Sequence, residues 1–389
     1  MPKLINPFNP GSGTPPPFLA GRDDDIAMFK ESLDRLSANR SVNLILTGLQ
    51  GTGKTVLLNE FNRICVEKGF APIRRLQFAG KHNEPEEFYG ALKSGMSAAI
   101  SGISTKIGKK LKTGGSGKSK TSRVSDVIHY EPPYGSDSPP FEDHIEDYLS
   151  KNWDAFEKGK YKGVVFVFDE FHRLYDNTRE KFHVLGDFIG TMNNLQNDGI
   201  PYHLVLAGLP KLPRNINNAR SYAERMFRTV RLSNLSEDDA KMAIIKPLED
   251  SPYSFTRDLV DAIIQDTSQY PYFVQFYCKE IIDNIPKKSI CLKDYQSFKS
   301  VITKQFDIGF FDLYMESLTS PEKKILISMA KIHEQDMQFE TILKKSEVKK
   351  ASLTRYLDNM EKKGLVYNHR FDVYRFSLPL LRDYIIRNY

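Results

Sequence analysis

One octapeptide, Gly-Leu-Gln-Gly-Thr-Gly-Lys-Thr at residues 48–55, has the residue types and spacing of a phosphate-binding loop between a strand and a helix. Its glycines let the backbone turn N–H groups inward around phosphate oxygens, and the helix start adds a positive potential. We expect Lys54 to reach the β- and γ-phosphates of a nucleotide and the Thr55 hydroxyl to ligate Mg²⁺. The predicted nucleotide contacts here are Gly48, Gly51, Thr52, Gly53, Lys54, Thr55 and Val56.

Two adjacent acids could complete the chemistry of such a loop. Asp169 ends the apolar segment Val-Val-Phe-Val-Phe, at the position where ligands of open α/β sheets bind. We expect it to hold Mg²⁺ through water, and Glu170 to orient and deprotonate an attacking water as a general base. By itself this segment could also be an acidic strand end that faces solvent. Both motifs, in this order, indicate hydrolysis of ATP rather than binding alone.

A second glycine- and lysine-rich stretch, residues 114–120, resembles a phosphate loop only in part. The position of the first glycine is occupied by Lys112, and the preceding residues are polar and lysine-rich instead of forming an apolar strand. Nothing there would aim backbone amides at a phosphate. We therefore predict a flexible basic loop and a single nucleotide site.

The composition describes a soluble globular chain with room for two or three domains: 389 residues, 40% hydrophobic and 27% charged. Its apolar runs are too short to span a bilayer, and three widely spaced cysteines suggest reduced thiols in a cytoplasmic protein. The net charge of +6 is uneven, because residues 101–125 carry seven basic and no acidic side chains. Residues 319–389 add 14 basic and 9 acidic ones. Two basic regions on an acidic body favour an anionic partner.

Five apolar segments that alternate with helical patterns predict an α/β fold with a parallel sheet covered by helices on both faces. These segments lie at 41–48, 71–78, 161–171, 202–210 and 227–236. Residues 79–162 form a long insertion, with a helix near its start at 84–100 and a mobile centre.

The remaining segments predict three flanking domains around the nucleotide-binding domain at 18–235. Residues 1–17, rich in proline and glycine, form a flexible or clamping arm. From Ser236 the pattern is helical, and we expect a helical lid over 236–312. Residues 313–389 have the order of a winged helix, with three helices followed by a hairpin.

With these features the chain resembles the AAA+ ATPases, near the origin-recognition and Cdc6 proteins and the STAND signalling ATPases. The resemblance implies a nucleotide-contacting segment at Pro-Pro-Pro-Phe-Leu-Ala-Gly-Arg, in which Phe18 packs on the adenine and Arg22 lies near the nucleotide. Phe18 could instead be a hydrophobic staple for the first helix. Pro271 is similar to a STAND-type proline close to the adenine. The cofactors implied are ATP or ADP and Mg²⁺.

The resemblance also implies an arginine that reaches the γ-phosphate of a neighbouring subunit, and so a homo-oligomer. Arg225 stands at the matching position, with Arg220 and Arg228 as alternatives. Two departures suggest slow, partner-stimulated hydrolysis. The fourth strand ends in Ala207 and Gly208, where a polar sensor is usual, and the lid lacks the arginine of the initiator branch.

Within the winged helix, the longer helix at 349–364 places Leu353, Leu357 and Met360 on one face and basic residues elsewhere. In DNA-binding winged helices such a helix enters the major groove. The predicted DNA contacts are Lys344, Lys345, Lys349, Lys350, Arg355, Arg370 and Arg375. The alternative is a STAND-like signalling or scaffold ATPase whose winged helix binds a protein partner. Neither reading involves a membrane.

Overall fold

The computed structural model describes residues 5–11, 13–38, 40, 42–113, 140–176 and 182–389. The predicted basic loop at 114–120 therefore lies outside the described residues. The chain divides into two compact units. One, here called the sheet unit, comprises Asp23–Thr47 and Leu57–Arg231. The other, here called the lid unit, comprises Met1–Arg22, Gly48–Val56 and Leu232–Tyr389, and so includes the phosphate loop.

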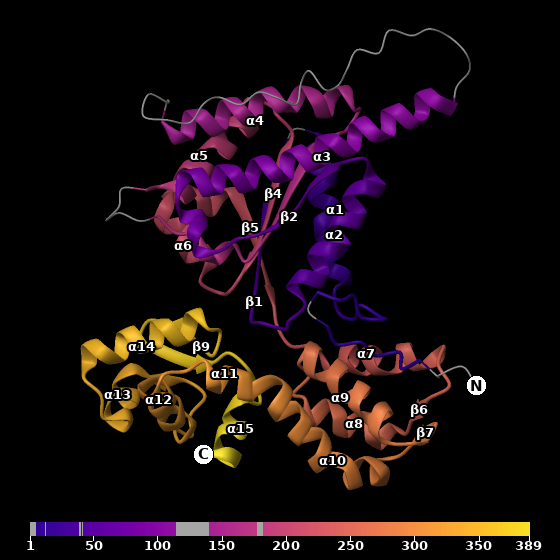
Figure 1. The fold of residues 1–389 in the computed structure, drawn as a ribbon, viewed down its shortest axis with the longest axis vertical. Coiled ribbons are helices and arrows are strands. Elements are labelled where there is room, and N and C mark those ends of the chain that lie inside the picture. The colour runs from indigo at the N-terminus through magenta and orange to yellow at the C-terminus, as the bar shows by residue number, and fades with distance from the viewer. Residues whose placement is uncertain (1–4, 12, 39, 41, 114–139, 177–181) are drawn as a thin grey trace. The chain divides into compact units, whose positions relative to one another are not determined.

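One sheet in the order β2-β3-β4-β1-β5 organises the sheet unit (Figure 1). β4 pairs in parallel with β1 on one side and with β3 on the other, and β3 pairs in parallel with β2. Every residue of β1, β3 and β4 is buried, as expected for central strands covered on both faces. The predicted parallel α/β sheet is confirmed. Its strands are β1 (Asn43–Gly48), β2 (Ala71–Gln77), β3 (Val164–Asp169), β4 (Tyr202–Gly208) and β5 (Phe227–Leu232).

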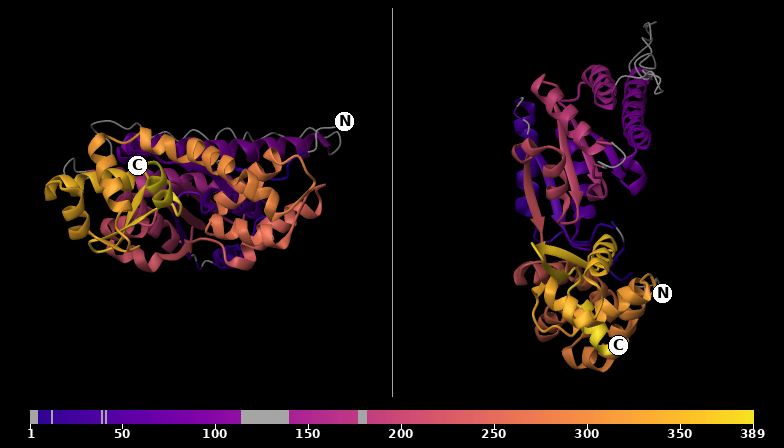
Figure 2. Two further views of the ribbon diagram at one scale, coloured as in Figure 1. Left: turned by 90° about the horizontal axis from the view of Figure 1, so that it is seen from below. Right: turned by 90° about the vertical axis from the view of Figure 1, so that its left-hand side faces the viewer.

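Helices cover both faces of this sheet, as Figure 2 shows. On one face, Phe29 of α1 stacks on Phe61 of α2 with ring centroids 4.0 Å apart. On the other, aromatic side chains of α3, α4 and α5 pack with Phe168 of β3 in one buried cluster. The helices are α1 (Asp23–Ser37), α2 (Lys54–Lys68), α3 (Pro85–Thr113), α4 (Phe141–Lys158), α5 (Val184–Asn197) and α6 (Leu212–Ala219). Short 3₁₀ turns are η1 (Gly80–Asn83), η3 (Phe171–Arg173) and η4 (Ser221–Met226).

The insertion between β2 and β3 is more helical than the sequence suggested. α3 continues to Thr113, well past the predicted end near residue 100, through the lysine-rich segment. α4 was not predicted, although its apolar residues recur at helical spacing. Phe141, Ile145, Leu149 and Phe156 are buried against the sheet unit's core. The insertion is therefore largely a pair of helices.

The lid unit is mostly helical and has one continuous hydrophobic core. The hydroxyl of Ser236 caps α7 by accepting from the N–H of Asp239 at 3.1 Å. A two-stranded parallel sheet joins β6 (Ser254–Phe255) to β7 (Ser289–Ile290). Its helices are α7 (Glu237–Glu249), α8 (Arg257–Asp266), α9 (Pro271–Asn284) and α10 (Leu292–Phe306), followed by the π-helical turn η5 (Asp307–Phe311) and α11 (Asp312–Glu316).

The C-terminal domain has the predicted helices and hairpin and one further strand. β9 and β10 pair antiparallel, and β8 adds to the other edge of β10. Leu353, Leu357 and Met360 of α14 are buried, as their spacing predicted. The elements are α12 (Ser320–Ala330), β8 (Met337–Gln338), α13 (Phe339–Ser346), α14 (Lys350–Lys362), β9 (Val366–Arg370), β10 (Val373–Phe376) and α15 (Leu381–Asn388).

The N-terminal arm contacts the helical lid. Phe8 is buried in the lid unit's core, and the Asn6 side-chain amide donates to the carbonyl of Lys279 and to the carboxylate of Asp283. Of the two alternatives for the arm, these contacts favour a clamp. No helix in the described part of the chain is long and apolar enough to span a membrane.

Candidate nucleotide-binding site

The phosphate loop has a backbone that only glycine adopts easily. Gly51 and Gly53 have φ angles of +87° and +93°, in the left-handed region. At Gly53 a Cβ would meet nothing within 4 Å, so its backbone conformation alone requires glycine. At Gly48 a Cβ would lie 2.8 Å from the Leu232 carbonyl oxygen, so close packing excludes a side chain. This backbone suits amides that turn inward around an anion.

Lys54 already lies across the loop that precedes it. Its Nζ donates to the carbonyl oxygens of Gly48 and Leu49, both at 2.8 Å, and the residue is 7% exposed. Lys54, Thr55 and Val56 form the first turn of α2, whose N–H groups point towards the loop. A buried ammonium above a helix start is well suited to charged phosphate oxygens, which are stronger acceptors than backbone carbonyls.

Arg22 braces the loop from the leading segment. Its Nη2 donates to the carbonyl oxygen of Thr52 at 2.9 Å and to that of Ser233 at 3.4 Å, and the residue is 8% exposed. The resemblance implies a position near the nucleotide for this side chain, and its guanidinium contacts the backbone of the phosphate loop. Phe18 packs against the lid unit's core, and Pro271 occupies the first turn of α9.

The two acids stand where β3 ends. Asp169 is buried, and its Oδ1 accepts from the N–H of Glu170 at 2.9 Å. Glu170 has a φ of 57°, in the left-handed region that costs a non-glycine residue about 1–3 kcal/mol. Its Oε2 accepts from Arg173 Nε at 3.2 Å. Strain of this kind is typical of functional positions, because the rest of the fold must maintain it.

The sheet brings the ends of β1 and β3 to the same edge. Both strands flank β4 in parallel, with Thr47 beside Gly208 and Phe168 beside Leu206. The phosphate loop follows Thr47 directly, and Asp169 follows Phe168. Carboxyl ends of parallel strands are where open α/β sheets bind ligands, and the ends of β1 and β3 both lie at that edge of this sheet.

The missing polar sensor at the end of β4 has a packing reason. A Cβ at Gly208 would lie 2.9 Å from the Cβ of His172 and 3.0 Å from its backbone nitrogen. His172 belongs to the turn η3, directly after Glu170 and Phe171. Because this turn approaches β4 so closely, a larger residue at position 208 would displace the segment that carries Glu170.

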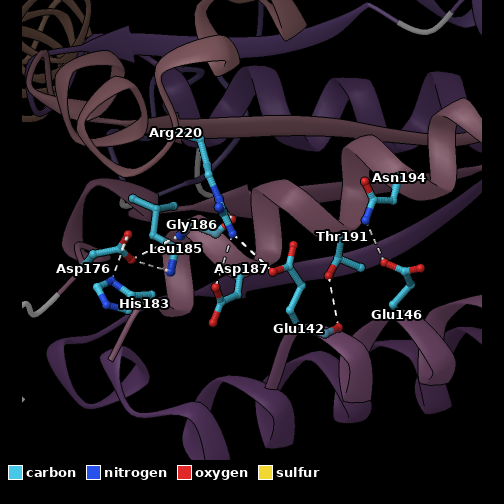
Figure 3. A network of polar contacts seen from close by, with 10 residues as sticks. All are labelled: Glu142, Glu146, Asp176, His183, Leu185, Gly186, Asp187, Thr191, Asn194 and Arg220. Carbon is cyan, nitrogen blue, oxygen red and sulfur yellow. Dashed lines mark hydrogen bonds and ion pairs between the residues drawn. The ribbon is translucent and has the colours of Figure 1, made fainter. Parts of the chain in front are cut away.

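Of the three candidate finger arginines, Arg220 is held within its own chain (Figure 3). Its Nε donates to the carbonyl of Gly186 at 2.9 Å, and its Nη2 lies 3.2 Å from Glu142 and 3.4 Å from Asp187. Burial and repulsion from Glu142 raise the pKa of Asp187 to about 6, against the pull of Arg220. Arg220 therefore ties α4 and α5 to the turn η4.

Arg225 and Arg228 are exposed, by contrast. Arg225 lies in η4, which Arg220 anchors at its start, and Arg228 lies in β5. The structure thus separates Arg220, which is held by its own chain, from the exposed Arg225 and Arg228.

Several of the predicted DNA contacts are engaged by acids of the same domain. Lys350 pairs with Glu340 at 2.8 Å, and Arg370 and Arg375 both pair with Asp336. Among the other predicted contacts, Lys345 donates to the carbonyl of Lys331 at 3.1 Å, and the Arg355 guanidinium lies 5.1 Å from the ring centroid of Tyr356. The exposed ones are Lys344, Lys345, Lys349, Lys350, Arg355 and Arg370.

Sequence reasoning missed the contacts of the lid with the loop. The hydroxyl of Tyr270, at the start of α9, donates to the carbonyl of Gln50 in the loop. No spacing rule connects a tyrosine of the lid with a variable position of the loop. Only the adjacent Pro271, already singled out, pointed to this part of α9.

Residues 19–187 match the family described as the AAA ATPase domain, and residues 308–385 match a domain of unknown function, DUF8462. No curated protein sequence matches the chain. The fold is similar to that of the Walker-type ATPase PABY2304 of Pyrococcus abyssi, with a TM-score of 0.60 at 14% identity over 95% of this chain and 96% of that one. It is also similar to the Aeropyrum pernix ORC2 protein in its ADP form, with a TM-score of 0.50 at 14% identity over 97% of each chain. Residues 19–187 are therefore similar to AAA ATPase domains, and the fold of the chain is similar to that of the Pyrococcus ATPase.

Proposed function

We propose that this chain is a nucleotide-dependent switch that binds ATP with Mg²⁺ and hydrolyses it slowly. The observation that carries the proposal is the loop at 48–55, with left-handed Gly51 and Gly53 and the buried ammonium of Lys54. The match to the AAA ATPase domain family supports it.

Each polar residue of the site has a distinct part in this proposal. Lys54 neutralises phosphate charge, and Glu170 takes the proton of the attacking water. Thr55 and Asp169 would hold Mg²⁺, which supplies charge neutralisation at the phosphates when bound. Within the described residues, no three His, Cys, Asp or Glu side chains gather as a metal site. A magnesium ion held jointly by a few protein oxygens and the phosphates is consistent with that.

Slow turnover follows from what the site lacks. Ala207 and Gly208 end β4 without a polar side chain, and close packing with His172 keeps the second position small. A water molecule would then be oriented mainly by Glu170. Phosphate release by the purified chain tests the proposal: a low but measurable rate that requires Mg²⁺ supports it, and no release above a protein-free blank contradicts it.

Arg225 is the proposed finger that acts on a neighbouring copy. If so, phosphate release per chain rises with protein concentration in the wild type, because assembly brings Arg225 to another chain's nucleotide. Arg225→Ala is expected to lose this rise while keeping the rate of the dilute protein. Arg214→Ala, which removes another exposed arginine from α6, is the matched control. If phosphate release per chain still rises with protein concentration in Arg225→Ala, Arg225 is not the finger.

The C-terminal domain is proposed to be a winged helix that binds duplex DNA. Its order of helices and strands supports this, as do the exposed Lys349 and Arg355 on the helix segment 349–363. Affinity for duplex is expected to fall with salt, and the slope of log K against log salt to decrease by about 1 for each phosphate contact removed. Fluorescence anisotropy of Lys349→Ala and Arg355→Ala measures this, with Lys293→Ala on α10 as control.

A protein partner is the second candidate for the same domain. The ion pairs of Lys350 with Glu340 and of Arg375 with Asp336 favour it, because they neutralise side chains that would otherwise face phosphates. Phe371 at the hairpin turn is 91% exposed, which suits a protein contact. If the affinity for duplex DNA does not depend on salt, or is equal in all variants, the proposed partner of this domain becomes a protein instead of DNA.

A further inference from the structure

One variable position of the phosphate loop, Gln50, is contacted from two parts of the lid unit. The hydroxyl of Tyr270 donates to its backbone carbonyl, and Tyr314 of α11 interacts with its side chain. Gly364, in the turn between α14 and β9, lies so close that a Cβ there would be 3.1 Å from Gln50 Oε1. The lid and the C-terminal domain therefore meet the loop at the same residue.

Tyr270 is well fixed for such a contact. It is fully buried at the start of α9, and its ring lies 4.6 Å from that of Phe273, centroid to centroid. The ring also borders the next loop residue. A Cβ at Gly51 would lie 3.0 Å from Tyr270 Cε1 and 3.2 Å from the Cβ of Tyr272. The hydroxyl can therefore not move far from the loop without disturbing the lid's core.

Holding the Gln50 carbonyl also orients an amide. The C=O of Gln50 and the N–H of Gly51 belong to one planar trans peptide, so the two groups point in opposite directions. A tyrosine that fixes the carbonyl on the lid side thus turns the N–H of Gly51 away from the lid. Gly51 is among the loop residues expected to contact the nucleotide, and its φ of +87° suits this orientation.

We propose that Tyr270 is a positioning residue for the phosphate loop, and that Gln50 is the junction at which α9, through Tyr270, and α11, through Tyr314, set the loop's affinity for nucleotide. The inference rests on the proposed function, because the effect is on nucleotide binding. It assigns the two contacts separate roles: Tyr270 acts on the backbone of residue 50, whereas Tyr314 acts on its side chain.

Binding of a fluorescent ADP analogue (mant-ADP) measures the first role. Tyr270→Phe removes only the hydroxyl, and is expected to weaken binding about three- to tenfold, the usual net effect of one hydrogen bond. The matched control is Tyr277→Phe. Tyr277 is a buried tyrosine of the same core, and it interacts with Thr303 of α10. We expect Tyr277→Phe to leave the affinity for mant-ADP unchanged. This holds even if it lowers the melting temperature as much as Tyr270→Phe does.

A double-mutant cycle separates the two contacts. In a Gln50→Ala background the carbonyl of residue 50 remains, so Tyr270→Phe is expected to keep its full effect. Tyr314→Phe should weaken binding in the wild type and have no further effect in Gln50→Ala, because its partner side chain is gone. Gln50 is exposed, so this background is expected to fold normally. A merely structural tyrosine would not show this pattern.

The outcomes are distinct. If the wild type binds mant-ADP and Tyr270→Phe binds it with the same affinity as Tyr277→Phe, the positioning role is overturned and the proposed function remains intact. A Tyr314→Phe effect that persists in Gln50→Ala overturns the junction. Wild type that binds no nucleotide overturns the proposed function itself, and this inference with it.

Discussion

Replacing Lys54 with methionine is expected to weaken the binding of ATP with Mg²⁺ by roughly 30- to 700-fold, which corresponds to about 2–4 kcal/mol. The ammonium is buried and donates to two loop carbonyls, so it lies at the centre of the loop before any ligand arrives. Phosphate oxygens are charged acceptors, and methionine offers them neither charge nor a proton. Equilibrium dialysis with radiolabelled ATP measures the change directly.

The control for this substitution is Lys30→Met, which removes an exposed lysine from α1. Its affinity should match that of the wild type. Circular dichroism establishes that Lys54→Met retains its helices, since α2 begins at this residue. An affinity within about threefold of the wild type would mean that Lys54 does not meet a phosphate.

Glu170→Gln is expected to slow hydrolysis by about 10²–10⁴-fold while nucleotide binding stays close to that of the wild type. Glutamine keeps the shape and the hydrogen bond that Arg173 donates, but it cannot take a proton from water. Single-turnover hydrolysis with enzyme in excess measures the chemical step apart from product release.

Glu157→Gln is the matched control, since Glu157 is an exposed carboxylate on α4 of the same unit. It should leave both binding and hydrolysis unchanged. If Glu170→Gln weakened binding and hydrolysis equally, Glu170 would be part of the binding surface and not the base. Hydrolysis at the wild-type rate would assign the base to another residue.

The sheet could be predicted because its evidence is local. β1, β3 and β4 are buried along their whole length, and such strands appear in the sequence as unbroken apolar runs. The loop at 48–55 was equally clear, since glycine spacing and the adjoining strand and helix lie within one short segment. Neither prediction required knowledge of contacts between residues that are far apart in the sequence.

Elements whose formation depends on distant packing were harder to predict. α4 follows a turn-rich stretch, and its buried Phe141 and Phe156 acquire meaning only beside α3 and α5. α3 extends to Thr113 through glycines and lysines that by themselves suggest a loop. In α4, tertiary contacts outweigh the local preference.

The residues of the site could be predicted from the sequence, but the hydrogen bonds that hold them in place could not. Arg22 was expected beside the nucleotide, and its actual hydrogen bond to the Thr52 carbonyl joins segments far apart in sequence. Tyr270 reaches Gln50 across a still longer separation. The pairing of Arg375 with Asp336 likewise could not be read from charge counts, because composition does not show which charges neutralise each other.

Calorimetric titration of the wild-type chain with ATP and Mg²⁺ tests the central claim most directly. The account predicts uptake of one nucleotide per chain, and loss of that heat at the same concentrations in Lys54→Met. Absence of binding heat in the wild type, or a second equivalent of nucleotide taken up by each chain, would contradict it.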